Sequence, residues 1–250
     1  GLDNMRLTNE ICKICKREFE RGKINVSSAG TLLSFMEKPN FKMSFGFAQY
    51  CAEGNLCGDT IKTINDSRGH MVFIISDGMG KGSRAALDGA MGAGLLSKLL
   101  SAGFGFDSSL KVVNSALLVK SHEESLATLD CVRVDLFSGK CEFYKAGAPR
   151  SYIVKDDRLT KCELTSMPAG ILRGVEFAKR TTVLNTDDEI IMMSDGVTDV
   201  GNEWLEKFLR LETTLEPNEK AKAILKIALE NSDEKHRDDM SVIVAKMLER

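Results

Sequence analysis

Two apolar runs with the same ending stand out in the hydrophobic pattern of this chain. The first covers residues 71–75 and leads into Ser-Asp-Gly at 76–78, and the second covers residues 190–193 and leads into Ser-Asp-Gly at 194–196. Continuous apolar runs of this length, bounded by turn residues, are typical of strands that are buried on both faces. We therefore predict two buried strands, each with an aspartate at its end.

The residues before the first run predict an antiparallel partner for it. Residues 60–64 alternate between polar and apolar types, and residues 65–69 supply the Asn, Asp, Ser and Gly of a turn. Asp59 and Asp77 lie at similar distances from that turn, so a hairpin brings them side by side. The alternative interpretation of Asp59 is a turn residue at the start of a strand.

Helices and strands do not alternate regularly along the rest of the chain. Helical patterns cover residues 4–21, 83–101, 107–121, 202–211 and 217–231. Further strand patterns cover residues 41–52, 128–137, 140–145, 151–154 and the apolar residues up to 245. Because helices are inserted into a strand-rich chain rather than placed between successive strands, the pattern predicts an α+β fold and not a doubly wound sheet.

Composition and charge narrow the classes of function. The 250 residues have a formal net charge of -2 and contain no basic run with interleaved aromatic residues, which argues against nucleic-acid binding. No apolar segment reaches membrane-spanning length and no signal peptide opens the chain, so we expect it to lie in the cytoplasm, outside the membrane. Seven cysteines without regular spacing predict reduced thiols. Gly1 in place of an initiator Met indicates a fragment of a longer protein.

Acids at the predicted strand ends are the candidate chemistry. Asp77 and Asp195 end the two apolar runs, and Asp59 is expected beside the first of them. Asp238 and Asp239 precede the last strand. Mg²⁺ and Mn²⁺ prefer such oxygen ligands, and a pair of these ions activates water against phosphate esters. The alternative is that each Asp-Gly is a turn after a strand.

Other catalytic motifs do not fit the residues. The glycine-rich turn at 78–82 lies between a strand and a helix, as a nucleotide site would, but its spacing matches neither GxGxxG nor GxxxxGK[ST]. The chain also lacks GxSxG and HExxH. Metal-assisted hydrolysis therefore fits the residues best.

Four acidic motifs together resemble one enzyme family. They are Gly-Asp at 58–59, Asp-Gly-Met-Gly-Lys-Gly at 77–82, Ser-Asp-Gly at 194–196 and Arg-Asp-Asp-Met-Ser-Val-Ile-Val at 237–244. In this order they resemble the metal-dependent PPM (protein phosphatase 2C-like) serine/threonine phosphatases, and more closely the phosphatase domains of the bacterial stage II sporulation protein E family. The resemblance covers residues 41–248. We expect a phosphatase domain at 41–250, and an amino-terminal linker or regulatory helix with a connecting segment at 1–40.

The resemblance implies an αββα sandwich, in which two antiparallel sheets are flanked by helices and hold two Mn²⁺ or Mg²⁺ ions at their ends. Asp77 would bridge both ions. Asp59 and the Gly78 carbonyl would complete one ion site, and Asp195 and Asp238 would hold the other. The four aspartates would act in catalysis through a metal-bridging water that attacks the phosphorus in line.

The chain departs from the best-known family members in two ways. It has no clear counterpart of the arginine that holds the phosphate in the animal enzymes. Asp239 stands where many relatives have Asn, and its role is open.

The resemblance also implies a substrate and a setting. The substrate would be phosphoserine on a small anti-sigma factor antagonist, whose dephosphorylation releases a sporulation sigma factor. The sporulation relatives are membrane proteins, so this chain would be a cytoplasmic part of one, with the helix at 4–21 as a connector and as a contact in a homodimer. The alternatives are a stress-response phosphatase of the same family with a different antagonist, and a catalytically silent interaction module. The presence of all four acidic positions favours an active enzyme.

Overall fold

The described chain divides into two compact units, residues 1–40 with residue 250 and residues 41–249. The computed structural model describes residues 4–52, 54, 56–66, 68–80, 82–120, 126–156, 158–174, 176–201, 203–212, 214–234 and 237–250. Within these ranges, no helix has both the length and the apolar character that a membrane span requires. All seven cysteines lie in these ranges and are free, as the absence of regular spacing predicted.

The smaller unit contains a helix and a hairpin. The helix α1 (Asn4–Cys15) ends before the predicted boundary at residue 21, because Lys16 has a φ of 52° and this left-handed conformation ends helices. The hairpin of β1 (Lys23–Ser27) and β2 (Gly30–Ser34) was not predicted, and every residue of β1 is exposed.

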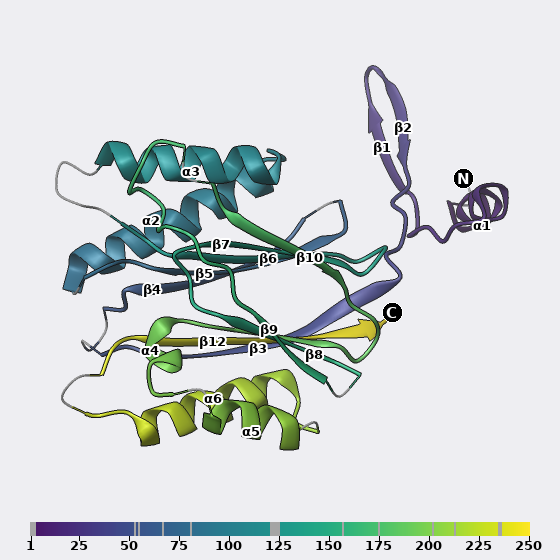
Figure 1. The fold of residues 1–250 in the computed structure, drawn as a ribbon. Coiled ribbons are helices and arrows are strands. Elements are labelled where there is room, and N and C mark those ends of the chain that lie inside the picture. The colour runs from purple at the N-terminus through teal and green to yellow at the C-terminus, as the bar shows by residue number, and fades with distance from the viewer. Residues whose placement is uncertain are drawn as a thin grey trace. The chain divides into compact units, whose positions relative to one another are not determined.

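In the described part of the larger unit, two antiparallel sheets of five strands form a sandwich (Figure 1). The first sheet has the order β10-β7-β6-β5-β4, and the second has the order β3-β12-β11-β8-β9. The strands of the first are β4 (Asp59–Asn65), β5 (His70–Asp77), β6 (Leu129–Asp135), β7 (Lys140–Ala146) and β10 (Ala178–Val183). Those of the second are β3 (Phe41–Tyr50), β8 (Ser151–Lys155), β9 (Arg158–Cys162), β11 (Glu189–Met193) and β12 (Met240–Glu249).

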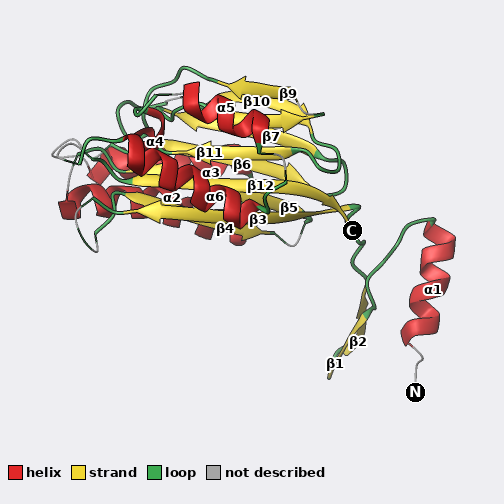
Figure 2. Cartoon of the chain, turned by 90° about the horizontal axis from the view of Figure 1, so that it is seen from below, coloured by secondary structure: helices red, strands yellow, loops and turns green. Residues whose placement is uncertain are grey.

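Helices cover the outer faces of this sandwich (Figures 1 and 2). The first sheet is covered by α2 (Gly82–Ser101) and α3 (Phe106–Lys120), and the second by α5 (Glu203–Leu211) and α6 (Pro217–Asn231). A short helix, α4 (Asp195–Thr198), follows β11. The α+β class and the αββα arrangement are therefore confirmed. Residues 121 and 202 of the predicted helices, and Lys81 of the glycine-rich turn, lie outside the described residues.

Alternate side chains of each buried strand enter different apolar layers. Phe73 and Ile75 of β5 pack in the core between the two sheets, whereas Val72 and Ile74 pack in the layer under α2 and α3. Both faces of the strand are thus covered, which explains the continuous apolar run at 71–75. In β11 the same alternation separates the inter-sheet core from the layer under α5 and α6.

A buried ion pair joins α6 to the second sheet. Lys220 Nζ lies 2.5 Å from Glu189 Oε2, and the two side chains are 1% and 5% exposed. Removal of one partner leaves the other charge buried without compensation.

We predict that Lys220→Met lowers the free energy of unfolding by about 3–5 kcal/mol, because it leaves Glu189 buried and unpaired. The double variant Glu189→Gln with Lys220→Met should recover part of that loss. Lys226→Met is the matched control, since Lys226 lies on the same helix with 78% of its side chain exposed, and it should change stability by less than about 0.5 kcal/mol. Urea denaturation measures all three, and equal losses for Lys220→Met and Lys226→Met would contradict the prediction.

Candidate metal centre

The pairing of β4 with β5 places Asp59 directly opposite Asp77. This register was predicted, and the turn between the strands explains it. Asp66 Oδ1 accepts hydrogen bonds from the backbone N–H groups of Arg68, at 2.9 Å, and His70, at 2.8 Å. The turn is therefore closed by its own side chain, and the two acids meet at the other end of the hairpin.

The second sheet brings Asp195 and Asp238 to its own end. Asp195 is the first residue of α4, immediately after β11, and Asp238 precedes β12, which pairs with β11. The two segments touch through backbone, because a β-carbon on Gly196 would lie only 2.2 Å from the Asp239 carbonyl oxygen. Glycine is therefore required after Asp195 for this close approach.

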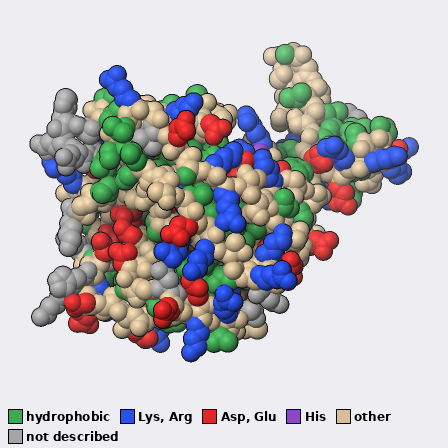
Figure 3. All heavy atoms as spheres, in the orientation of Figure 1, with side chains coloured by type: hydrophobic (Ala, Val, Ile, Leu, Met, Phe, Trp, Pro, Cys, Tyr) green, Lys and Arg blue, Asp and Glu red, His purple; other side chains and the backbone are tan. Residues whose placement is uncertain are grey.

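The other four acids all act electrostatically on Asp77. Burial raises the pKa of Asp77 to about 8, and repulsion from Asp195, Asp59, Asp238 and Asp239 adds to the rise. Like charges have this effect only at short range, so the acids of both sheets share one region. On the face drawn in Figure 3, acidic side chains gather on the left, the side on which β12 begins in Figure 1.

Asp59 is the most deeply buried of these acids, with 3% of its surface exposed. Burial raises the pKa of its carboxyl group to about 6. The hydroxyl groups of Ser194 and Ser241 oppose this rise, and repulsion from Asp195 and Asp239 adds to it. The two hydroxyl groups lie near without meeting hydrogen-bond geometry, so neither carboxylate oxygen has a partner among the described residues. A buried carboxylate without a partner is costly, and a cation would satisfy it.

Burial also raises the pKa of Asp195, and repulsion from Asp199 and Asp238 contributes. Among the described residues, no three acidic, histidine or cysteine side chains lie close enough to surround one ion as they stand. The residues therefore fit hard cations by donor type and by excess negative charge, and the assignment of each ligand remains a prediction.

Gly78 follows Asp77, the last residue of β5, and its backbone is fixed by two neighbouring segments. Its N–H donates to the Gly58 carbonyl at 3.2 Å, and a β-carbon at this position would lie 1.9 Å from the Ala85 carbonyl oxygen. The first turns of α2 thus pack directly on the backbone at Gly78, and a side chain has no room there.

Several polar residues that support the acids were not predicted. Gln49 Nε2 donates to the Asp59 carbonyl and to Ser241 Oγ, both at 3.1 Å. Thr128 Oγ1 accepts the Asp77 N–H at 3.2 Å. Neither Gln49 nor Thr128 belongs to a motif, and only the fold brings them to the acids.

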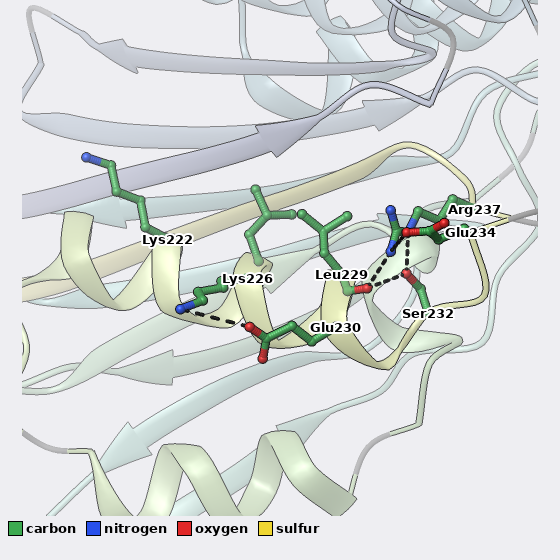
Figure 4. A pocket seen from close by; sticks show the side chains of 8 residues that line it. Lys222, Lys226, Leu229, Glu230, Ser232, Glu234 and Arg237 are labelled. Carbon is green, nitrogen blue, oxygen red and sulfur yellow. Dashed lines mark hydrogen bonds and ion pairs between the residues drawn. The ribbon is translucent and has the colours of Figure 1, made fainter.

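Arg237 lies next to Asp238 in sequence, but its guanidinium group points toward the end of α6 (Figure 4). Its Nη2 donates to the Leu229 carbonyl at 2.8 Å and its Nε to Ser232 Oγ at 2.7 Å. The guanidinium carbon also lies 5.9 Å from the centre of the Tyr50 ring. Arg237 therefore anchors the segment before β12 to α6 and to the end of β3.

Comparison with known proteins gives a family and several relatives. A family model described as Stage II sporulation protein E (SpoIIE) matches residues 67–248. Stage II sporulation protein E of Bacillus subtilis (strain 168) is 28% identical over 222 residues, which are 86% of this chain and 27% of that protein. Its counterpart in Priestia megaterium is 31% identical over 200 residues, which are 78% of this chain and 34% of that protein. The chain thus spans about a third or less of these relatives.

Solved structures share the fold. The PP2C phosphatase domain of SpoIIE from Bacillus subtilis with a fragment of its regulatory domain has a TM-score of 0.82 and 25% identity, and the match covers 100% of this chain and 76% of that one. The catalytic domain of the phosphatase PstP, solved with two manganese ions, has a TM-score of 0.67 and 18% identity over 83% of this chain and all of that one. Because the SpoIIE family model covers most of this sequence, the chain belongs to the stage II sporulation protein E family and is a phosphatase domain of the protein phosphatase 2C type.

Proposed function

We propose that this chain is a metal-dependent serine/threonine protein phosphatase that binds two Mn²⁺ or Mg²⁺ ions. One observation carries the proposal: Asp59 is buried without a hydrogen-bond partner directly opposite Asp77, in a region where acids of both sheets repel one another. Such a concentration of negative charge suits hard cations. The proposed ligands are Asp59, Asp77, Gly78 through its carbonyl, Asp195 and Asp238.

The roles within this set follow from position. Asp77 is the proposed bridging ligand, since it is repelled by acids from both sheets. Asp59 and Gly78 flank it on the first sheet, and Asp195 and Asp238 face it from the second.

The protein's part in the reaction is to hold these carboxylates in place before substrate arrives. Divalent cations, when bound, supply a Lewis acid and a water of lowered pKa for phosphate ester hydrolysis. Gln49 and Thr128 fix the backbone of Asp59 and Asp77, so both side chains start from rigid strand ends. The Arg237 guanidinium group is hydrogen-bonded to α6. We therefore expect the phosphate site not to use this arginine.

We also propose a phosphorylated anti-sigma factor antagonist as the substrate and a sporulation sigma factor as the released partner. Membership of the stage II sporulation protein E family supports this choice over a stress-response antagonist. The domain at 41–250 would carry catalysis. Residues 1–40 would be a connector in a longer protein with this part in the cytoplasm, and α1 would contribute to a homodimer.

We predict that the chain hydrolyses a phosphoserine peptide with Mn²⁺ or Mg²⁺ and not with a chelator. Asp77→Asn should lower kcat/KM roughly a thousandfold, since loss of a bridging ligand removes several kcal/mol of charge stabilisation. Asp107→Asn, on the exposed first turn of α3, is the control and should match the wild type. Full activity of Asp77→Asn would rule out the proposed centre, and an inactive wild type would favour the silent module.

Thermal unfolding should separate charge repulsion from metal binding. With chelator present at neutral pH, Asp77→Asn should raise Tm, because the burial and repulsion that raise the pKa of Asp77 to about 8 also oppose folding, and a neutral amide avoids both. With Mn²⁺ at about 100 times its Kd, the wild type should gain about 2.7 kcal/mol and the variant much less. The variant should thus be the more stable protein with chelator and the less strongly stabilised one with Mn²⁺. An equal response of both proteins to Mn²⁺ would contradict the prediction.

The substrate proposal predicts that a phosphorylated anti-sigma factor antagonist is hydrolysed with a kcat/KM roughly a hundredfold above that of a phosphoserine peptide cut from it, since contacts remote from the phosphate add binding energy. A phosphorylated stress-response antagonist is the comparison substrate. Preference for that protein, or equal rates on peptide and protein, would overturn the substrate proposal while leaving the phosphatase activity in place.

A further inference from the structure

We propose that Asp239 is a positioning residue that connects the two halves of the metal centre through the backbone. The inference rests on the proposed function. Asp239 Oδ1 accepts the N–H of Ala52 at 2.7 Å, and its Oδ2 accepts the N–H of Gly58 at 2.5 Å. Both oxygens of one carboxylate are therefore bound to backbone donors far away in sequence, and such charge-assisted hydrogen bonds are short and strong.

One of these two bonds, to Gly58, crosses from the second sheet to the first, and the other stays within the second sheet. Ala52 follows β3, which belongs to the second sheet, and Gly58 precedes β4, which belongs to the first. Asp239 itself precedes β12 of the second sheet. The carboxylate thus fixes both ends of the connection between the sheets, at the end of the sandwich where the acids lie.

Gly58 passes this constraint to two proposed ligands. It directly precedes Asp59, and its carbonyl accepts the N–H of Gly78 at 3.2 Å. The N–H of Gly58 is held by Asp239 while its C=O holds Gly78. Displacement of the Asp239 carboxylate therefore moves a backbone unit bound to both Asp59 and Gly78.

Asp238 and the segment of Asp195 also adjoin Asp239. Its N–H donates to Asp238 Oδ1 at 2.9 Å, which orients that carboxylate. Its carbonyl oxygen packs against Gly196, next to Asp195, closely enough that a β-carbon there would lie at 2.2 Å. Asp239 thus contacts Gly58, Asp238 and Gly196 directly, and it is linked to Gly78 through Gly58.

An asparagine at this position would satisfy the loop less well. It has one acceptor oxygen, and its amide group would face a backbone N–H donor. We therefore expect Asp239→Asn to raise the Kd for Mn²⁺ at least tenfold, the usual effect of losing a group that orients ligands. Electron paramagnetic resonance of free Mn²⁺, titrated against the whole chain at constant ionic strength, measures this without turnover.

Asp66→Asn is the matched control for loss of such a bond. Asp66 also closes a loop by accepting two backbone N–H groups, but at the opposite end of β4 and β5. Asp66→Asn should lower the free energy of unfolding and leave the Kd for Mn²⁺ within about twofold of the wild-type value. A similar rise in both variants would mean that Asp239 acts only through stability and would overturn the proposal.

Gly58→Ala separates position from charge. All acids remain, but the new β-carbon would lie 3.1 Å from Asp239 Oδ2, which must shift to make room. We expect the Kd for Mn²⁺ to rise as it does in Asp239→Asn. If only Asp239→Asn weakens binding, the carboxylate acts by charge or direct coordination, and if only Gly58→Ala does, Asp239 is not the positioning group; either outcome overturns the proposal.

The same titration distinguishes this inference from the proposed function. A wild-type chain that does not bind Mn²⁺ would overturn the metal centre and the role of Asp239 with it. Binding by the wild type that Asp239→Asn leaves unchanged would overturn the role of Asp239 alone.

Discussion

Repulsion among carboxylates at one end of the sandwich is the constraint on which this domain depends. Asp59 and Asp77 come from one sheet, and Asp195 and Asp238 from the other, so the sheets carry like charges toward each other. The apolar layer between the two sheets holds them together against this repulsion. Cations bound between the acids would replace this repulsion with attraction. The residues that push the two sheets apart would then help to hold them together.

The sequence was sufficient to predict the features that rest on local pattern. The split of Val72 and Phe73 between two apolar layers produces an uninterrupted apolar run, and that run identified β5. The register of Asp59 with Asp77 followed from counting residues to a turn whose chemistry is local. The irregular order of helices and strands predicted only the α+β class. The αββα sandwich was predicted from the family resemblance.

Features that leave no signal in the apolar pattern were not predicted. The strands β9 and β10 lie at sheet edges and expose much of their surface, so their polar residues show no strand signal. The end of α1 depends on the conformation of Lys16, which apolar periodicity does not report. Gln49 reaches Ser241 across almost the whole chain, and a lone glutamine in a strand gives no indication of such a partner.

The order of strands in the second sheet has a consequence for synthesis on the ribosome. β3 opens the larger unit and pairs along its full length with β12, which closes it. Strands β4 to β7 pair with their neighbours in sequence and can assemble as the chain emerges, whereas β3 must wait for the last strand. The first sheet can therefore form co-translationally, while the second sheet and its share of the acids are completed only after β12 has left the exit tunnel.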